Sequence, residues 1–547
     1  MLETPLRELP VLIVDCQTTG ASPVLGSILE LGWCVARADG TEPEAEAHWI
    51  LLPEGERISA QVRALTGFHE GVLEHALAPE DAWRRLRAAL PVDRAPSAIH
   101  FARFELSFLK DWATRFEPDT PFPIEAVCVH AIACRLYPDL PRRNLRALAG
   151  FLGHGLHLER RSLGHVLATS FIWQKLVSEL EGRGIRDWAA LGAWLASADK
   201  PATPRKRRYP IAPASYRSLP DQSGVYRFLR SNGDVLYVGK ATSLKKRVSS
   251  HFTKQSGATE RALEMLTQVS DIAFTATSSA LEAALLETQL IKQLDPPYNV
   301  QLVQGERGVW FASTDFRSAT TEPDDQHPFG PLSSRYSVRA LGALRQLLAG
   351  AESTASLRAA SVGAPVRFGP EEPAFSAGFA LFRDKHGSTD ARLIARRILL
   401  ASPEEPEPEA AADDAPKVWD PPRVCRHLER ASAQAYQVWR RAAWLCLLAD
   451  SSIAYREPGA AVTRYLSIGA AELTTSGDLT ADAPLPAPER SSRRVAQRAF
   501  DAARYDWLRI LTTELKRILR DGGEVKVRLS RTRLLQGAAL ARVLRVV

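Results

Sequence analysis

Two proline-rich stretches of opposite charge divide this chain and constrain its fold more than any other feature. Residues 200–218 (KPATPRKRRYPIAPASYRS) carry lysine and arginine without an acidic residue. Residues 401–422 (ASPEEPEPEAAADDAPKVWDPP) are acidic, rich in proline and alanine, and too poor in apolar residues to build a core. Since 547 residues also exceed what one core holds, we expect several domains joined by these linkers.

The linkers define six segments. They are an N-terminal domain over 1–195, a basic linker over 196–215, a compact domain over 216–305, a middle region over 306–400, an acidic linker over 401–422 and a C-terminal region over 423–547. We expect the C-terminal region to be mainly helical, because leucines follow helical spacing over 491–520 before Gly522-Gly523. We interpret this leucine stripe as a packing face.

The composition is that of an ordinary globular protein with a basic surplus. The formal net charge of +7 agrees with a polyanionic partner. The six cysteines lack metal-ligand spacing, which argues against zinc, an iron–sulfur cluster and a disulfide scaffold and favours a reducing compartment. No signal peptide is evident, and no apolar run approaches the ~20 residues that a membrane span needs. We expect a cytoplasmic, nucleoid-associated protein without a membrane partner.

The compact domain is predicted to begin with a β-hairpin. Two β-rich runs, GVYRFLR and DVLYVGK, flank an Asn-Gly pair, which is a strong hairpin signal. A two-residue turn at Asn232-Gly233 places Tyr226 opposite Gly239 and makes Tyr226 and Tyr237 diagonal neighbours on one face, ~7–8 Å apart or less. Gly239 then leaves space beside the Tyr226 ring. Taken alone, the two tyrosines fit ordinary strand positions as well as a functional site.

Two helices are predicted after the hairpin. Thr242 or Ser243 can cap the first, which starts with three basic residues that are either solvated or a phosphate site (Lys245, Lys246 and Arg247). LEAALLETQLIKQL over 281–294 predicts the second, ended by a Pro-Pro pair. Glu287 has only apolar neighbours three and four residues away, so its carboxylate needs a metal, a salt bridge or hydrogen bonds.

In this order, the segments GVY, LYVGKATSLKKRV, EAALLETQLIK and PPYNV resemble the GIY-YIG nuclease domain of the UvrC excinuclease family. The resemblance covers about 216–302 and implies a small α/β domain that hydrolyses a phosphodiester bond. It also implies that Glu287 holds a single Mg²⁺ (or Mn²⁺), a hard ion that prefers oxygen ligands and keeps most of its waters.

The same resemblance implies roles for the remaining site residues. Tyr237 would help to take the proton from the attacking water, with Lys240 and the metal favouring the phenolate, since a phenol with a pKa of about 10 is otherwise a poor base. Arg247 would clamp the scissile phosphate and stabilise its developing charge. Tyr226 would orient the water or the phosphate, and Asn299 would hold the local structure.

Basic residues near this domain are candidates for contacts with DNA. In the linker they form either a solvated tether or a strap that grips phosphates between two domains. The candidates are Lys245, Lys246, Arg205, Lys206, Arg207 and Arg208.

The N-terminal domain resembles DnaQ-like 3′–5′ exonucleases, the proofreading-subunit family, over about 8–180. VLIVDCQTTG, ILELG, AIHFARFELSFL and two later segments over 133–156 and 159–176 follow the order of that family. The resemblance implies an RNase H-like exonuclease fold, in which helices flank a mixed sheet.

The catalytic residues of that family are only partly present. Asp15 and Glu105 match two of its four carboxylates, Gln17 and His165 replace the other two, and Arg160 replaces its histidine base. Gln17 is neutral, and Arg160 repels cations and accepts no proton at neutral pH. We expect this exonuclease site to be inactive or nearly so. The domain would then hold DNA, with Arg160 and His165 on phosphates, or persist as a structural relic.

The rest of the chain shows no second catalytic constellation, although 329–350 weakly resembles the segment after the UvrC nuclease domain. As a whole, the chain resembles Cho-type UvrC homologues fused to a DnaQ-like domain. The leading hypothesis is a DNA repair endonuclease that acts with UvrA/UvrB-type partners. The alternatives are a bifunctional enzyme with residual exonuclease activity and a non-catalytic DNA-binding scaffold.

Overall fold

The computed structural model describes residues 4–155, 161–197, 208–253, 258–302, 308–348, 373–386, 420–480, 483–488 and 497–547. They form two compact units. The first unit comprises Met1–Ala276 and Pro296–Tyr298, and the second comprises Thr277–Asp295 and Asn299–Val547. Four of the predicted site residues, Arg160, Arg205, Lys206 and Arg207, lie outside the described residues.

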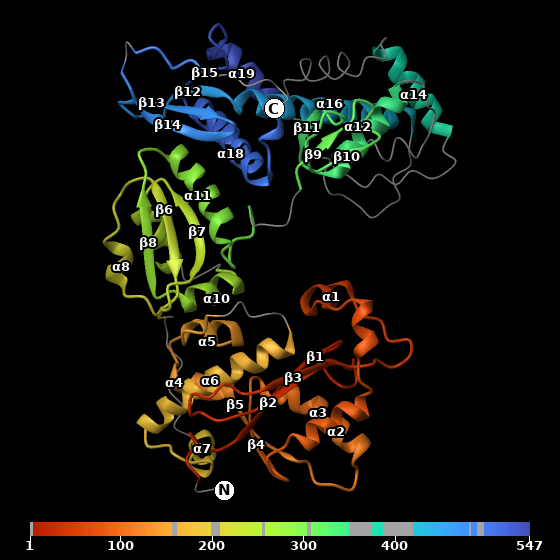
Figure 1. The fold of residues 1–547 in the computed structure, drawn as a ribbon, viewed down its shortest axis with the longest axis vertical. Helices are drawn as coiled ribbons and strands as arrows, with labels where there is room; N and C mark the ends of the chain where they lie inside the picture. Colours follow the sequence, from red (N-terminus) through yellow and green to blue (C-terminus); the bar gives the residue numbers. More distant parts are fainter. Residues whose placement is uncertain are drawn as a thin grey trace. The chain divides into compact units, whose positions relative to one another are not determined.

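A five-stranded mixed sheet forms the centre of the N-terminal domain (Figure 1). Its order is β3 (Ala45–Trp49), β2 (Ile28–Ala36), β1 (Val11–Thr18), β4 (Ala95–Ile99) and β5 (Ile124–Cys128). The first three strands are antiparallel, whereas β4 runs parallel to β1 and to β5. Because side chains alternate along a strand, Val11 and Ile13 enter one core while Leu12 and Val14 enter another.

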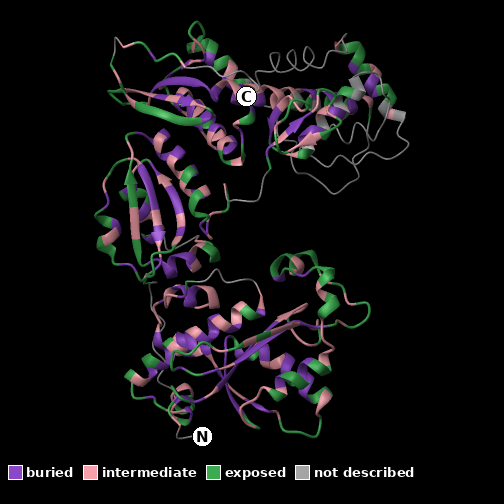
Figure 2. Ribbon diagram, viewed as in Figure 1, coloured by how far each residue is buried: buried purple, intermediate pink, exposed green. Residues whose placement is uncertain are grey.

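Helices cover both faces of this sheet, as the sequence predicts for the domain. The long helix α6 (Ser162–Gly182) packs on β1 and β2, while α2 (Pro79–Ala88) and α3 (Ala102–Phe116) contribute to the core on the other face. The strands are mostly buried (Figure 2). The described residues of the domain also include α1 (Ala60–Thr66), a 3-10 helix (Glu70–His75), α4 (Val129–Leu136), α5 (Leu145–Phe151) and α7 (Trp188–Ala196).

A smaller antiparallel sheet follows in the first unit, with the order β7 (Val235–Ala241), β6 (Gly224–Leu229) and β8 (Asp271–Ala276). Three helices accompany it: α8 (Pro213–Arg217), α9 (Leu244–Thr253) and α10 (Glu260–Gln268). The hairpin register is confirmed, since Tyr226 pairs with Gly239 and Phe228 pairs with Tyr237.

Two details of this region differ from the prediction. The hairpin loop has three residues instead of two: the Arg230 N–H donates to the Asp234 carbonyl, and Gly233 takes a left-handed conformation at φ +89°. A turn followed by a left-handed glycine is a common solution for a three-residue hairpin loop. The predicted basic linker also ends earlier, because Ile211 is buried in the core of this domain and α8 begins at Pro213.

Buried polar groups join α5 of the N-terminal domain to α10 within the first unit. The Arg230 guanidinium donates to Gln268 Oε1 at 2.8 and 3.1 Å, and Gln268 Nε2 donates to the Tyr298 hydroxyl at 2.6 Å. That hydroxyl donates to Glu264, which also accepts from Asn144 at 2.6 Å. Because each group is bonded, the network can be buried without an unpaired charge.

The second unit contains α11 (Ala280–Leu294) and a five-stranded antiparallel sheet. The sheet order is β14 (Glu472–Leu479), β13 (Thr463–Gly469), β12 (Ser451–Arg456), β15 (Glu524–Arg528) and β16 (Leu534–Gln536). Its main helices are α16 (Pro421–Leu448), α18 (Ala502–Arg520) and α19 (Gly537–Val546). Helices are the larger share of the regular structure in the described C-terminal residues, as expected, but they pack with a sheet that the sequence did not predict.

The leucine stripe predicted over 491–520 is a packing face, because Leu508, Leu511, Leu515 and Ile518 of α18 are buried in the core of this unit. The acidic linker ends before residue 422, contrary to the prediction. Pro421 and Pro422 open α16, and Asp420 caps it, since proline suits the first turn of a helix.

The described part of the middle region contains a three-stranded sheet and two helices. The strands are β10 (Ala319–Thr320), β9 (Trp310–Ala312) and β11 (Phe329–Leu332), in sheet order, and the helices are α12 (Arg335–Leu348) and α14 (Pro373–His386). No helix in the described part of the chain has the length and apolar character needed to cross a bilayer.

Candidate functional site

Two tyrosines and a histidine cluster on the hairpin of the first unit. Tyr226 is fully buried, and its hydroxyl shares a hydrogen bond of 2.8 Å with Nε2 of His251. The ring of the half-buried Tyr237 lies 6.1 Å from the Tyr226 ring, centroid to centroid, so the tyrosines are neighbours as predicted. The space expected beside Gly239 is filled, because a Cβ there would lie 2.6 Å from the Tyr226 ring.

Helix α9 brings basic residues to this cluster. Ser243, one of the two predicted caps, accepts the Lys246 N–H at 3.2 Å. Arg247 is exposed in the first turns, as are Lys245 and Lys246. The sequence interpretation missed His251, although it follows Arg247 by four residues and therefore shares a helical face with it. That spacing was the available signal.

Glu287 and Asn299 belong to the second unit. Glu287 is half-buried on α11, whose residues Ala283, Ala284 and Ile291 are buried as predicted. Asn299 directly follows Tyr298, whose backbone N–H donates to the Leu236 carbonyl of β7 in the first unit. Among the described residues no group of three or more His, Cys, Asp or Glu could hold a metal. A lone carboxylate suits a hard ion that retains its waters, such as Mg²⁺.

The second unit holds α11 through polar contacts at several positions. The Glu457 carboxylate accepts the backbone N–H groups of Ala280 and Leu281 at 3.3 and 3.1 Å, where a helix N-terminus favours negative charge. Near the other end, Lys292 forms a buried ion pair of 2.9 Å with Asp506 of α18. Glu282, in the first turn of α11, accepts from Arg464 at 2.7 Å.

The degenerate exonuclease residues meet in one pocket of about 940 Å³ in the N-terminal domain. The His165 Nδ1 atom lies 3.2 Å from both carboxylate oxygens of Asp15 and 3.2 Å from the Gln17 amide nitrogen. Glu105 is buried and accepts the backbone N–H of Cys16 at 2.9 Å. The predicted grouping of Asp15, Gln17, Glu105 and His165 is therefore found in the structure.

Burial and the charge of Asp15 both affect the protonation of its neighbours in this pocket. Burial opposes protonation of His165, but the hydrogen bond and the charge of Asp15 outweigh it and raise the pKa of His165 above its ordinary value. Burial, together with the charge of Asp15, raises the pKa of Glu105 well above its ordinary value. Two divalent cations do not fit this donor set, because an imidazole and an amide stand beside the single carboxylate of Asp15.

Glu30 is a buried acid in this domain that the sequence interpretation did not single out. It is fully buried on β2 and accepts from the Arg161 guanidinium at 2.7 Å and from the Ser162 backbone N–H at 2.9 Å. The pair ties β2 to the start of α6, the helix that carries His165. A glutamate inside the apolar run ILELG was the sequence signal for it.

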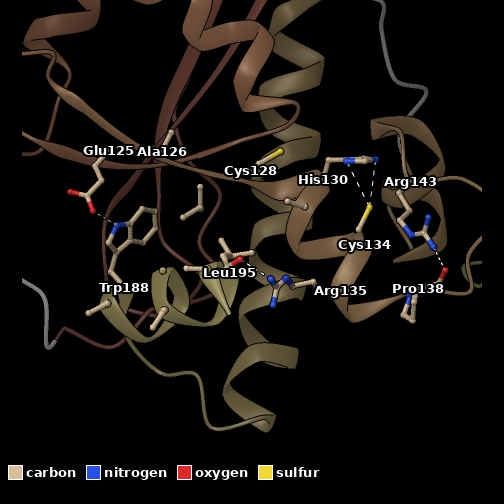
Figure 3. A pocket seen from close by; sticks show the side chains of 16 residues that line it. Glu125, Ala126, Cys128, His130, Cys134, Arg135, Pro138, Arg143, Trp188 and Leu195 are labelled. Atoms are coloured by element: carbon tan, nitrogen blue, oxygen red, sulfur yellow. Dashed lines mark hydrogen bonds between the residues drawn. The ribbon is translucent and has the colours of Figure 1, made fainter. Parts of the chain in front are cut away.

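A second pocket, of about 1090 Å³, is lined by β5, α4 and α7 (Figure 3). Its polar side chains mostly serve the fold. Arg135 donates to the Trp194 and Leu195 carbonyls at the end of α7, and the Trp188 indole donates to Glu125. Cys134 lies 3.8 Å from the ring nitrogens of His130. We interpret this pocket as a joint between elements.

Comparison with known proteins identifies the central domain. The family model of the UvrC-like GIY-YIG domain matches residues 222–300. The UvrABC system protein C of Alkalilimnicola ehrlichii is 44% identical over 24% of this chain and 22% of its own length. The magnesium-bound GIY-YIG N-terminal endonuclease domain of UvrC from Thermotoga maritima is 31% identical, with 16% of this chain and 92% of that chain covered and a TM-score of 0.15.

A longer similarity includes the N-terminal domain. A Mycobacterium tuberculosis protein, named for a proposed bifunctional exonuclease/endonuclease activity, is 28% identical over 62% of this chain. The chain spans 53% of that relative's length. Residues 222–300 are thus a UvrC-like GIY-YIG domain, carried by a chain that is similar to a proposed exonuclease/endonuclease.

Proposed function

We propose that this protein is a DNA repair endonuclease that incises one strand near damage through a single-metal GIY-YIG site. The main support is the cluster of Tyr226, Tyr237 and His251, with Arg247 one turn before His251 on α9, within residues that match the UvrC-like family model. Glu287, on α11 and within the matched residues 222–300, is the proposed metal ligand.

In the proposed mechanism, Glu287 would hold Mg²⁺ (or Mn²⁺), which supplies Lewis-acid stabilisation of the developing negative charge. Tyr237, half-buried on β7, would accept a proton from the attacking water, and the positive charge of Lys240 on the same strand would favour the phenolate. Arg247, exposed on α9, would bind the scissile phosphate through its planar fork of donors. Tyr226 is buried and hydrogen-bonded to His251. We therefore assign it to positioning Tyr237 and orienting the attacking water or the phosphate.

Asn299 would keep the segment after α11 in place. The backbone N–H of its neighbour Tyr298 donates to β7, the strand that carries Tyr237. The segment after α11 is therefore held to the same strand as Tyr237. Lys245 and Lys246 would add phosphate contacts along α9, and Arg208 would add one before α8. Such contacts position DNA without reading its sequence.

We assign the N-terminal domain to binding or positioning DNA, without exonuclease activity. The support is the internal pairing of His165 with Asp15 and the burial of Glu105, which leave no place for two metals. A residual exonuclease would need Asp15 freed from this pair. UvrA/UvrB-type proteins are the proposed partners, since UvrC relatives of the central domain belong to a UvrABC system. The cytoplasm, at the nucleoid, is the corresponding location.

The test is an end-labelled duplex with one bulky lesion, incubated with Mg²⁺ and UvrA/UvrB-type partners. We expect a discrete nick with the wild type and at least about a hundredfold less with Glu287→Gln, which keeps the shape but loses the charge. Glu282→Gln makes the same substitution on the same helix, away from the proposed metal ligand. It is the matched control for a loss of nicking that comes only from destabilising α11. Equal nicking by wild type and Glu287→Gln would exclude this site, and 3′ shortening by both would restore the exonuclease alternative.

A further inference from the structure

The pocket of the N-terminal domain is lined by aromatic and basic side chains as well as by the degenerate exonuclease residues. Phe101 and Phe104 come from the start of α3, as does Arg103, and Arg146 comes from α5. Phe101 is 46% exposed, and Arg103 is also exposed. An aromatic ring beside arginines is the combination that holds a base and its phosphate in single-strand binding proteins.

His100 lines the same pocket and packs its ring against Phe101 and His130. Its side chain is more than nine-tenths buried, and neither ring nitrogen has a hydrogen-bond partner in the described part of the chain. Burial, with smaller effects of His130 and His165, lowers the pKa of His100 to about 3, so the ring is neutral. A buried polar group left unpaired costs free energy, which a ligand in the pocket could recover by supplying a donor or an acceptor.

Phe101 is held in a strained backbone conformation. Its φ of +57° and ψ of +44° are left-handed, a region that non-glycine residues rarely adopt. The conformation presents a half-exposed ring that contacts His130 at 4.6 Å between centroids. Strain of this kind persists where the surroundings impose it and often marks a functional position.

Two arginines line the pocket beside the degenerate exonuclease residues. Arg103 is exposed, and the half-buried Arg146 lies 4.0 Å from a carboxylate oxygen of Glu264. The Asp15 carboxylate lies against the His165 imidazole, and Glu105 is buried. A phosphate therefore suits this pocket better than the metal ions that its four-carboxylate relatives would hold.

We propose that this pocket binds an unpaired nucleotide of a DNA strand without any metal ion, the base against Phe101 and Phe104 and the phosphate beside Arg103, Arg146 and His165. The inference rests on the proposed DNA-binding role of the N-terminal domain and specifies its ligand. Chelation of divalent metal ions should therefore leave binding intact, whereas a nucleotide held through two metal ions would be released.

The test uses the full chain and a fluorescently labelled short single-stranded DNA in EDTA, with anisotropy as the readout. Phe101→Gly is the informative variant, because glycine suits the left-handed backbone and should keep or raise stability while it removes the ring. We expect its affinity to fall roughly fivefold to a hundredfold, the value of one stacked base. Arg103→Gln should weaken binding and lower the salt dependence by about one phosphate contact.

Arg84→Gln is the matched control, since Arg84 is an exposed arginine of the same domain outside the pocket. It should bind as the wild type does. Binding that vanishes in EDTA and returns with Mg²⁺ in the Glu287→Gln background would overturn the proposal. So would wild-type affinity of both Phe101→Gly and Arg103→Gln with thermal stability intact. Neither result touches the endonuclease, which the lesion-duplex assay tests separately.

Discussion

Single side chains decide whether the tyrosine cluster can work as a site. The sequence predicted the neighbouring positions of Tyr226 and Tyr237, because strand alternation and the Asn-Gly turn fix them. It did not predict the burial of Tyr226 or its bond to His251, because a partner on another element depends on how α9 packs on the hairpin. Residue identity therefore gives the candidates, and packing gives their roles.

The hydrogen bond between Tyr226 and His251 should contribute measurably to stability. We expect His251→Leu to lower the free energy of unfolding by about 1–3 kcal/mol, because the buried Tyr226 hydroxyl loses this bond. Tyr226→Phe should cost less than His251→Leu, and the double variant should cost less than the sum of the two. A double-mutant cycle by urea unfolding measures this coupling, and additive losses would mean that the bond contributes nothing.

Elements with regular patterns were predictable. The spacing of leucines gave α18, and the Pro-Pro pair gave the end of α11. The five-stranded C-terminal sheet was missed, because its strands are short and β14 is largely exposed, so alternation of apolar residues is weak there. The contact between α5 and α10 could not be predicted from the sequence either. It consists of polar residues that become buried only when the two domains pack together.

The joint between α5 and α10 should be sensitive to a single methyl group. A Cβ on Gly150 would lie 2.0 Å from Gln268 Oε1, and Gln268 is buried in the network with Arg230 and Tyr298. We expect Gly150→Ala to destabilise the first unit by about 1–3 kcal/mol, as overpacking does. Thermal unfolding provides the measurement.

The control for this change is Gly192→Ala. Gly192 is a helical glycine of α7, and a methyl group added to it would have no described atom within 4 Å beyond its own helix and chain neighbours. Alanine there should be neutral or stabilising by up to about 1 kcal/mol. If Gly150→Ala and Gly192→Ala unfold at the same temperature, Gln268 moves aside without a loss of stability. The hydrogen bonds between α5 and α10 would then not hold Gln268 in a fixed position.

At the scale of the molecule, the boundary of the family domain and the boundary of the folded unit do not coincide. The UvrC-like match spans 222–300, yet α11 within it belongs to the second unit. Leu281 and Leu285 of α11 are buried in the core formed with α16, α18 and the C-terminal sheet. The helix that carries Glu287 is thus part of a core that the rest of the family domain does not supply.

A chain that ends at residue 302 should therefore lose nuclease function even though it keeps every proposed site residue. It would expose Leu281 and Leu285, worth about 1.5–3 kcal/mol each, and would remove Asp506 from Lys292 and Glu457 from the helix start. Such a loss is a large part of the 5–15 kcal/mol of a typical domain. We expect a lower unfolding temperature and at least tenfold less nicking than the full chain.

Replacing both leucines with glutamine in the fragment distinguishes aggregation of the fragment from misplacement of Glu287. If solubility returns and nicking does not, the second unit is needed to hold Glu287 in place. Full nicking by either fragment would show that the family domain functions alone.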